Sequence, residues 1–486
     1  MSSAATSSAA FRDLPIGIDT SGQRTESDSM GEIEVPANRY WGAQTQRSLI
    51  HFCIGDARMP KAVYHAMGYV KKAAAMLHKQ AGRMDGEVAD AIIQACEETI
   101  AGDLDASYPL YVYQTGSGTQ SNMNVNEVVA NRAIQLLDGT LGSKQPVHPN
   151  DHVNMGQSSN DTFPTAMHIA TVQALEDKLF PAVEALTAAI GDKSAQWMSR
   201  PKIGRTHLQD AVPLTVGQEW SGFEAQLHDA MTRLQQARDG LYPLAIGGTA
   251  VGTGLNAPAR FSADMARTLA ELTGRPFVTA SNKFAAQAAL DPSVAAMAAL
   301  RGLAVVLMKI ANDLRWLASG PRCGIGELRL PANEPGSSIM PGKVNPTLCE
   351  ALVMVSIQVI GLDNAVAFAG SQGNFELNAM RPILINNLLQ ANAMLSDGCD
   401  LFCRYVIEGT ELVDETIDTH LQRSLMLVTA LSPEIGYDKA AEVAQKASAE
   451  GTTLKDAILE LDYMEEEEFD RVADPQRMTG SGVGGA

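Results

Sequence analysis

Four polar segments hold most of the side chains in this sequence that could do chemistry. They are residues 115–124, 157–162, 204–210 and 336–346. The second directly precedes a long helical pattern, and free backbone N–H groups at the start of a helix bind carboxylates. His207 adds a proton carrier and Lys343 a cation to these hydroxyls and amides. Together the segments predict a site for a small dicarboxylate.

Each segment also has a purely structural interpretation. Ser158 or Asn160 could cap the helix that follows, although capping uses only one or two of the polar groups. A single histidine such as His207 is usually structural. Glu350 faces an otherwise apolar helical segment, where a carboxylate needs a partner, and a histidine would serve. The set of segments, more than any one of them, favours a catalytic site.

Three motifs fail the tests for cofactor or metal sites. Residues 336–343 have five residues between their glycines rather than four, and Val344 stands where a nucleotide site needs serine or threonine. Residues 247–254 follow no strand pattern and fit a tight loop between helices better than a dinucleotide site. His148 and His152 have no obvious third zinc ligand. The sequence therefore predicts neither cofactor nor metal.

Composition excludes several classes of protein. The chain has 486 residues and a net charge of −19. An acidic surface repels phosphate backbones, so we expect no nucleic-acid partner, and local positive charge must capture any anionic substrate. The six cysteines form no CxxC pair, which is typical of reduced, mostly buried thiols rather than an iron–sulfur site.

Apolar periodicity predicts the elements that position these segments. Steps of three and four predict long helices over residues 169–190 and 220–234, and Pro181 should kink or restart the first. Residues 293–318 and 348–360 are apolar nearly all round, so other helices must surround them. We therefore predict a long bundle whose outer faces are covered by other subunits, and no membrane span.

Domain boundaries follow from shifts in composition. Residues 1–27 are rich in Ser, Ala and Thr, lack the apolar core of a signal peptide, and should form a disordered extension. We predict a mixed, mostly helical domain over residues 28–156 and a helical-bundle domain over 157–410. Residues 411–486 should form a small C-terminal helical domain with a flexible tail. Its acidic run at 465–468 suits the first turn of a helix.

The segment 336–346 closely resembles the signature loop of the fumarase/aspartase superfamily. The other three polar segments match the superfamily's remaining motifs in order and spacing, and the resemblance covers nearly the whole chain. His207, the run at 158–160 and Thr347 resemble class II fumarases, whereas aspartases typically place glutamine at the histidine position. Leu348 departs from the pattern, since many fumarases have glutamine there.

The resemblance implies a mainly α, three-domain fumarase/aspartase-like fold with a long central helical bundle that forms a tetrameric helix core. It implies the reversible hydration of fumarate to (S)-malate through an aci-carboxylate carbanion, with no cofactor. Ser337 would take the C3 proton, and His207, oriented by Glu350, would act on the departing hydroxyl. The implied substrate-binding residues are Ser117, Gly118, Thr119, Ser158, Ser159, Asn160, Thr206, Ser338, Lys343, Val344 and Asn345.

The resemblance also implies the partners and the location. Fumarate and malate would be the ligands of a cytoplasmic homotetramer in which three subunits build each active site. Some fumarases carry a second dicarboxylate site, at the segment that matches His148, Pro149, Asn150 and Asp151. An arginine often precedes that histidine, and here Lys144 and Gln145 occupy the stretch.

Three other functions stay open on the sequence alone. An ammonia-lyase acting on aspartate would share the fold, and His207 argues against it. Argininosuccinate- and adenylosuccinate-type lyases need room for a large leaving group, and their signature loops differ from residues 336–346. The third is a scaffold or structural protein that has lost catalytic activity. Such proteins normally lose their catalytic residues, whereas here they are all present: Thr119, His207, Ser337, Lys343, Asn345 and Glu350.

Overall fold

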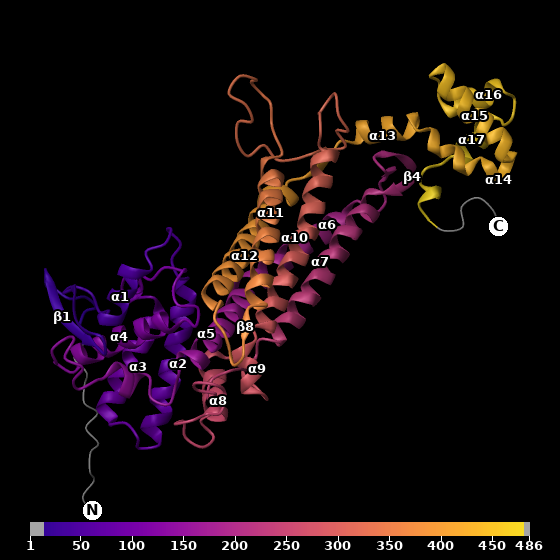
Figure 1. Cartoon of the computed structure of the whole chain (residues 1–486). Helices are drawn as coiled ribbons and strands as arrows, with labels where there is room; N and C mark the ends of the chain where they lie inside the picture. Colours follow the sequence, from indigo (N-terminus) through magenta and orange to yellow (C-terminus); the bar gives the residue numbers. More distant parts are fainter. Residues whose placement is uncertain (1–13, 481–486) are drawn as a thin grey trace, which may run out of the picture. The chain divides into compact units, whose positions relative to one another are not determined.

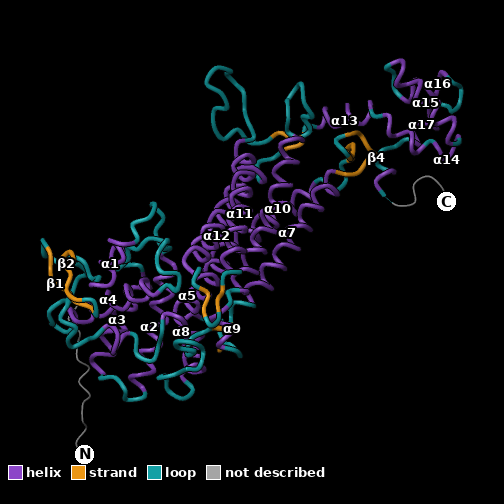
Figure 2. Tube along the Cα trace, in the orientation of Figure 1, coloured by secondary structure: helices purple, strands orange, loops and turns teal. Residues whose placement is uncertain are grey.

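The computed structural model describes residues 14–480, and most of them are helical (Figure 1, Figure 2). The chain forms two compact units. The first takes its described residues from 14–179, 233–301 and 358–393, and the second from 180–232, 302–357 and 394–480. Within the described residues, strands pair only as short two-stranded ribbons. This confirms the prediction of a mainly α fold.

A β-hairpin opens the first unit. β1 (Gln23–Asp28) pairs antiparallel with β2 (Gly31–Pro36). The guanidinium of Arg24 donates to Glu26 and to four backbone oxygens within residues 36–41. The prediction of disorder through residue 27 is therefore wrong for the part of the extension that forms β1, because these contacts order it. Residues 1–13 of the predicted extension lie outside the described residues.

Helices make up most of the first unit. They are α1 (Ala43–His51), α2 (Lys61–Gln80), α3 (Gly86–Ala101), α4 (Thr119–Leu136), α5 (Ser159–Ala174), α8 (Phe261–Thr273) and α9 (Lys283–Ala288). α2 packs against α3, α5 and α8, and α4 packs against α3 and α5. Most of the side chains of α4 and α5 are buried, so packing holds these two helices in place. The first two polar segments lie at those two N-termini.

Two short ribbons complete the first unit. β5 (Pro243–Leu244) pairs in parallel with β6 (Val278–Thr279). β8 (Gly373–Asn374) pairs antiparallel with β9 (Leu377–Asn378). The glycine-rich segment 247–254 is an irregular loop between β5 and α8, as the sequence predicts.

Five long helices follow the apolar patterns in the sequence. They are α6 (Phe180–Gln196), α7 (Val216–Asp239), α10 (Asp291–Leu317), α11 (Thr347–Gly370) and α12 (Arg381–Phe402). The division between the two units falls within the last four. A π-turn over Leu175–Leu179 interrupts the pattern just before Pro181, where the helix restarts, because proline cannot donate a helical hydrogen bond.

The apolar surfaces of α10 and α11 differ in how far one chain covers them. Both helices are long and apolar enough to cross a membrane by length and composition alone. The most apolar window of α10 is 56% buried, whereas that of α11 is only 33% buried. Met354, Ile357 and Phe368 of α11 are exposed. The expectation that α11 is surrounded is therefore not met within a single chain.

The second unit holds two ribbons and the C-terminal helices. β3 (Pro201–Thr206) pairs antiparallel with β4 (Gln209–Thr215), and β7 (Leu328–Arg329) with β10 (Glu411–Leu412). The helices that follow are α13 (Asp414–Arg423), α14 (Ser432–Ile435), α15 (Tyr437–Glu450), α16 (Leu454–Glu460) and α17 (Glu466–Val472).

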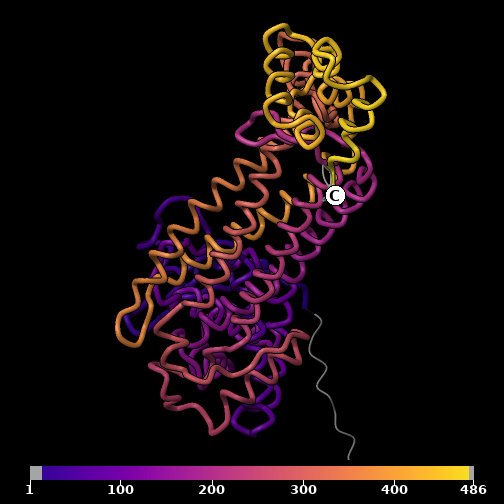
Figure 3. Tube along the Cα trace, turned by 90° about the vertical axis from the view of Figure 1, so that its right-hand side faces the viewer, coloured from indigo at the N-terminus to yellow at the C-terminus, as the bar shows by residue number. Residues whose placement is uncertain are grey.

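The last four of these helices gather around a hydrophobic cluster of their own (Figure 3). Leu431, Val443 and Ile458 are completely buried in it. Three glutamates of the acidic run lie in the first turn of α17, as predicted. The domain boundaries proposed at 156/157 and 410/411 stay predictions.

The cysteines agree with the expectation of mostly buried thiols. All six are free, and four of them are buried. Cys53 and Cys323 are exposed.

Candidate active site

Two helix N-termini in the first unit carry a chain of hydroxyls. α4 begins at Thr119 and α5 at Ser159, 40 residues apart in the sequence. Thr119 Oγ1 lies 2.8 Å from Ser117 Oγ and 2.7 Å from Ser159 Oγ. The structure therefore brings together three of the predicted substrate-binding residues. Hydroxyls beside the free N–H groups of a helix N-terminus are suited to binding a carboxylate.

Close packing explains the glycines of the first polar segment. Gly118 has φ +80° just before α4, and a Cβ there would lie 2.1 Å from the ring of Phe163. A Cβ on Gly116 would lie 1.4 Å from the carbonyl oxygen of Ala379. Both positions require glycine, because a side chain would push the segment off its neighbours. The structure gives Gly118 a packing role, and its predicted contact with substrate stays a prediction.

The second polar segment is held by a capping box and a buried carboxylate. Ser158 Oγ accepts from Asn160 N at 3.2 Å, and Asp161 Oδ1 accepts from Ser158 N at 2.9 Å. Asp161 Oδ2 accepts from the N–H groups of Gly247 and Thr249, both at 2.9 Å. Burial raises the pKa of Asp161 to about 6, although these hydrogen bonds act to lower it. The glycine-rich loop thus supports the start of α5.

A buried lysine lies under the same segment. Lys71 of α2 is fully buried, and its Nζ donates to the side-chain oxygens of Asn122 at 2.7 Å, Asn154 at 3.0 Å and Gln157 at 3.1 Å. Burial lowers the pKa of Lys71 to about 7. Three acceptors match the three N–H donors of an ammonium group, so this geometry favours the charged form. Sequence reasoning missed Lys71, because it stands in an ordinary amphipathic helix outside every motif.

These groups surround a hollow of about 630 Å³. Its walls include Thr119, Ser158 and Ser159, together with the three amides that Lys71 holds. Asn150 and Asp151, from the segment of the predicted second site, also line it. Asn160 Nδ2 donates to the carbonyl oxygen of Ala250 at 2.8 Å, so its amide is engaged by the glycine-rich loop.

Arg381 connects the segment of Ser117 to the start of α5. Its side chain is fully buried at the start of α12, and Nη1 donates to the carbonyl oxygens of Ser117 at 3.3 Å and Ser159 at 3.5 Å. Nη2 donates to the carbonyl oxygen of Gln287 at 2.9 Å. Burial lowers the pKa of Arg381 to about 10, which leaves the guanidinium charged at neutral pH. This residue also lies outside the sequence motifs.

In the second unit, His207 lies at the tip of the β3–β4 hairpin. His207 and Leu208 have φ of +56° and +60°, as a two-residue hairpin turn of this hand requires. Residues other than glycine rarely hold this conformation, and where they do it is often at functional sites. Thr206 and His207 are both exposed. The hairpin turn presents the histidine at its tip.

A buried ion cluster fixes the base of this hairpin. The carboxylate of Glu327 lies 2.7 Å from Arg205 Nη2 and 3.0 Å from both Lys202 Nζ and His420 Nδ1. Lys202 and Glu327 are almost completely buried. Burial acts to raise the pKa of Glu327, but the charges of Lys202 and Arg205 and the hydrogen bonds hold it at about 2. β3 is therefore anchored two residues before the histidine.

The signature loop surrounds the Ser337 hydroxyl with backbone donors. Ser337 Oγ accepts from Ile339 N at 3.3 Å and from Met340 N at 3.1 Å. Two N–H donors on one oxygen stabilise negative charge there. The arrangement suits a serine that has to lose its proton.

Hydrogen bonds between its two ends close the same loop. Gly336 N donates to the carbonyl oxygen of Lys343 at 3.0 Å, and Asn345 Nδ2 donates to the carbonyl oxygen of Gly336 at 2.5 Å. The side chains of Ser338, Lys343 and Val344 are exposed, and that of Asn345 is partly buried. Lys343 is thus open to solvent.

Glu350 lies in the first turn of α11 and is exposed. Among the residues that the structure describes, it forms no hydrogen bond or ion pair with His207. Glu350 is exposed because one chain leaves this face of α11 open. Its pairing with a histidine stays a prediction.

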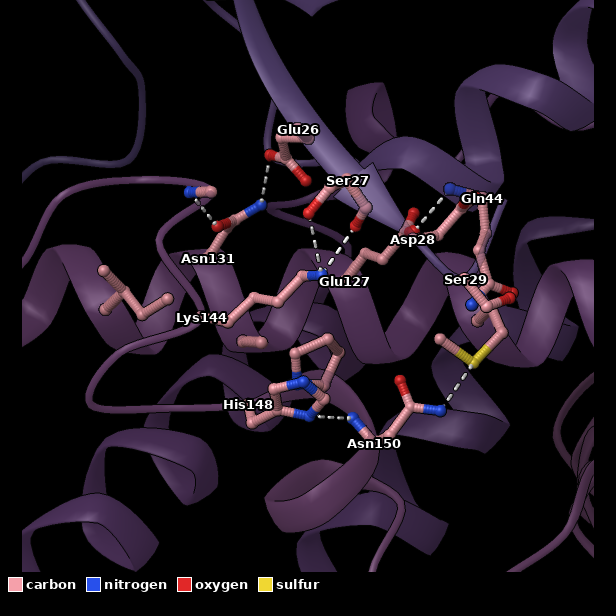
Figure 4. A pocket seen from close by; sticks show the side chains of 15 residues that line it. Glu26, Ser27, Asp28, Ser29, Gln44, Glu127, Asn131, Lys144, His148 and Asn150 are labelled. Carbon is pink, nitrogen blue, oxygen red and sulfur yellow. Dashed lines mark hydrogen bonds between the residues drawn. The ribbon is translucent and has the colours of Figure 1, made fainter. Parts of the chain in front are cut away.

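Figure 4 shows a hollow beside the predicted second dicarboxylate site. His148 Nδ1 accepts from the backbone N–H groups of Asn150 and Asp151, each at 3.1 Å, and so caps the turn that follows. Lys144 Nζ donates to the carbonyl oxygen of Ser27 at 2.6 Å. The lysine near the position of the expected arginine is therefore bonded to β1.

Two family models match the sequence. One, described as lyase, matches residues 31–361. The other, described as fumarase C C-terminus, matches residues 427–480. Together they account for most of the chain.

Relatives align with nearly the whole chain. A class II fumarate hydratase from Methanosarcina acetivorans is 63% identical, over 96% of this chain and 97% of the relative. A mitochondrial fumarate hydratase from Rhizopus oryzae is 56% identical, over 94% and 92%. The crystal structure of a class II fumarase from Schistosoma mansoni superposes with a TM-score of 0.92 at 42% identity, over 95% of this chain and 100% of that one. The chain belongs to the class II fumarate hydratase family of lyases.

Proposed function

We propose that this chain catalyses the reversible hydration of fumarate to (S)-malate, a step of the tricarboxylic acid cycle, without a cofactor. The observation that carries the proposal is the hydroxyl chain of Ser117, Thr119 and Ser159 at two helix N-termini. Lys71 and Arg381 lie buried beneath it and add positive charge. Such a surface suits the carboxylates of a small dianion.

In the direction from malate, the C3 proton leaves first and the C2 hydroxyl departs as water. The C3 proton is weakly acidic, so fixed donors have to stabilise the carbanion as it spreads into the neighbouring carboxylate. We assign this role to Lys343 and Asn345 of the signature loop. Ser337 takes the C3 proton, and the N–H groups of Ile339 and Met340 stabilise the negative charge on its oxygen.

His207 manages the proton on the departing hydroxyl, and Glu350 orients its imidazole and supports the positive form. The hairpin presents His207, and the first turn of α11 presents Glu350. Because no bond joins them within one chain, we propose that this pair forms between subunits. The remaining predicted residues hold the carboxylates or border the substrate: Ser117, Gly118, Thr119, Ser158, Ser159, Asn160, Thr206, Ser338 and Val344.

We propose a homotetramer whose helix core contains α10 and α11 and whose active sites each draw on three subunits. Met354, Ile357 and Phe368 support it, because burial of each such side chain contributes about 1.5–3 kcal/mol. A cytoplasmic location and the three predicted domains belong to the same proposal. Light scattering of an active preparation should give four times the mass of one chain. A mass near 51.8 kDa would contradict the tetramer.

The second dicarboxylate site at His148, Pro149, Asn150 and Asp151 is part of the proposal. Crystals soaked in malate should show a ligand beside the imidazole of His148. Density at the main site alone, with none near His148, would remove the second site.

The rival reading is an ammonia-lyase acting on aspartate. The test is ultraviolet absorbance of the purified protein with malate and, separately, with aspartate, in a chelator and without added metal. Absorbance that rises with malate alone supports the proposed function. A rise with aspartate alone assigns the chain to the ammonia-lyases. No rise with either compound favours a lyase with a larger substrate, or a structural protein that has lost its catalytic activity.

A further inference from the structure

Buried positive charge under the hollow of the first unit exceeds buried negative charge. Lys71, Lys283 and Arg381 each interact electrostatically with one carboxylate, that of Asp161. Within residues 14–480, none of these three cations has a carboxylate oxygen within 4.0 Å of its charged nitrogens. Their hydrogen bonds run only to neutral oxygens. With all three cations protonated, three positive charges and one negative charge leave two positive charges uncompensated.

Other buried cations in the chain have carboxylates of their own. The side chain of Arg132 is as inaccessible to solvent as that of Arg381. Its guanidinium donates two hydrogen bonds, of 2.7 and 2.8 Å, to the carboxylate of Glu98. Lys202 lies 2.8 Å from Glu219 and 3.0 Å from Glu327. A buried charge without a counter-charge is costly, so proteins normally pair it. The set under the hollow departs from the pattern of these paired cations.

The unpaired cations stand directly behind the wall of the hollow. Arg381 donates to the carbonyl oxygens of Ser117 and Ser159, whose hydroxyls bracket Thr119. Its Nε is buried and has no hydrogen-bond partner in the part of the chain that the structure describes. Lys71 bonds three amides that line the hollow. One layer of residues separates each of these two cations from the hollow.

Lys283, the first residue of α9, is the third of these cations. It is partly buried, and its Nζ donates to the carbonyl oxygen of Leu244 at 2.6 Å. The one carboxylate among the lining residues of the hollow belongs to Asp151, which is exposed, so water screens its charge. The field inside the hollow is therefore set by the three cations and Asp161.

We propose that Lys71, Lys283 and Arg381 select a ligand with two negative charges over one with a single charge. The two carboxylates of a four-carbon dianion would neutralise the excess charge that the fold leaves under the hollow. These residues act through the carbonyl and amide groups in front of them, so they are positioning residues that also determine specificity. The inference rests on the proposed function, since it concerns the same site.

The test is calorimetric binding of succinate and of monomethyl succinate to the whole protein. Both resemble the substrate, and neither can be hydrated, but one carries two charges and the other one. We expect succinate to bind wild-type protein at least about tenfold more tightly. Arg381→Met and Lys71→Met should each reduce that ratio several-fold, and Lys283→Gln should reduce it less. Arg381→Lys, which keeps the charge, should restore most of it.

Arg132→Met is the matched control, because it removes an equally buried cation that has its own carboxylate. Its ratio should stay at the wild-type value. If thermal melting shows that Arg381→Met does not fold, Lys283→Gln decides, since its side chain is only partly buried.

Two results would overturn the inference. One is equal affinity of wild-type protein for both ligands. The other is a loss of affinity in the variants that leaves the ratio unchanged, as a purely structural role would give. A wild-type protein that prefers succinate but does not hydrate fumarate would refute the proposed function and leave this inference standing.

Discussion

Replacement of Glu327 by glutamine tests the anchor of the β3–β4 hairpin, which carries His207. The carboxylate holds Lys202, Arg205 and His420 at the base of β3, and its pKa is about 2 against an ordinary value of 4.5. At about 1.4 kcal/mol per pKa unit, that difference corresponds to about 3 kcal/mol of stability at neutral pH. Glu327→Gln should lose about this amount, because Arg205 loses its carboxylate and the buried Lys202 keeps only Glu219.

The lowered pKa of Glu327 also predicts how the stability difference between wild type and Glu327→Gln depends on pH. Because the pKa of Glu327 is lower in the folded protein, the unfolded chain takes up the proton first as the pH falls. The stabilisation is complete above about pH 4.5 and disappears as the pH falls toward 2. The gap between wild type and Glu327→Gln should therefore be constant from pH 8 to about pH 5 and narrow below that.

The assay is urea unfolding followed by circular dichroism, at fixed protein concentration and at a series of pH values. Glu411→Gln is the control, because Glu411 is an exposed carboxylate of the same unit, paired with Arg329, and its loss should change stability by at most ~0.5 kcal/mol. A gap below about 1 kcal/mol at pH 7 would refute the reasoning. So would a gap that does not narrow on acidification.

Three further substitutions test the site itself. His207→Asn and Ser337→Ala should each lower kcat by at least about a hundredfold, a typical share for acid–base catalysis, and near-normal turnover in either would remove that residue from the mechanism. Gly118→Ala places a Cβ 2.1 Å from the ring of Phe163 at φ +80°, so it should lower the melting temperature and abolish activity. Gly222→Ala, in open space on α7, should leave the melting temperature nearly unchanged, and an equal loss there would contradict the packing argument.

Local chemistry made part of the site predictable. Ser117, Thr119 and Ser159 stand in glycine-rich or helix-capping sequence, and such sequence predicts helix N-termini and exposed donors. The structure confirms that they meet. Lys71 and Arg381 could not be found in this way, because their importance comes from contacts across the fold. Arg381 reaches the carbonyl of Ser117 from 264 positions away.

The elements that were missed share one physical cause. The hairpin turn at His207 and Leu208 lacks the Asn-Gly or Asp-Gly pair that normally signals such a turn, so only its anchored base holds the left-handed backbone. β1 has the composition of a flexible extension, and contacts of Arg24 with residues 36–41 order it. In both cases tertiary contacts override a weak or contrary local signal.

The charges of this protein act at two different ranges. The net charge of −19 resides largely on exposed side chains, where salt screens it within about 10 Å, so it affects the approach of an anion more than its final affinity. Lys71 and Arg381 act from the interior, where screening is weak and a charge one residue from the ligand counts heavily. A strongly acidic protein can therefore bind a dianion, provided that the counter-charge is built into the fold beneath the site. For this reason the unpaired interior cations, more than the surface composition, indicate the charge of the ligand.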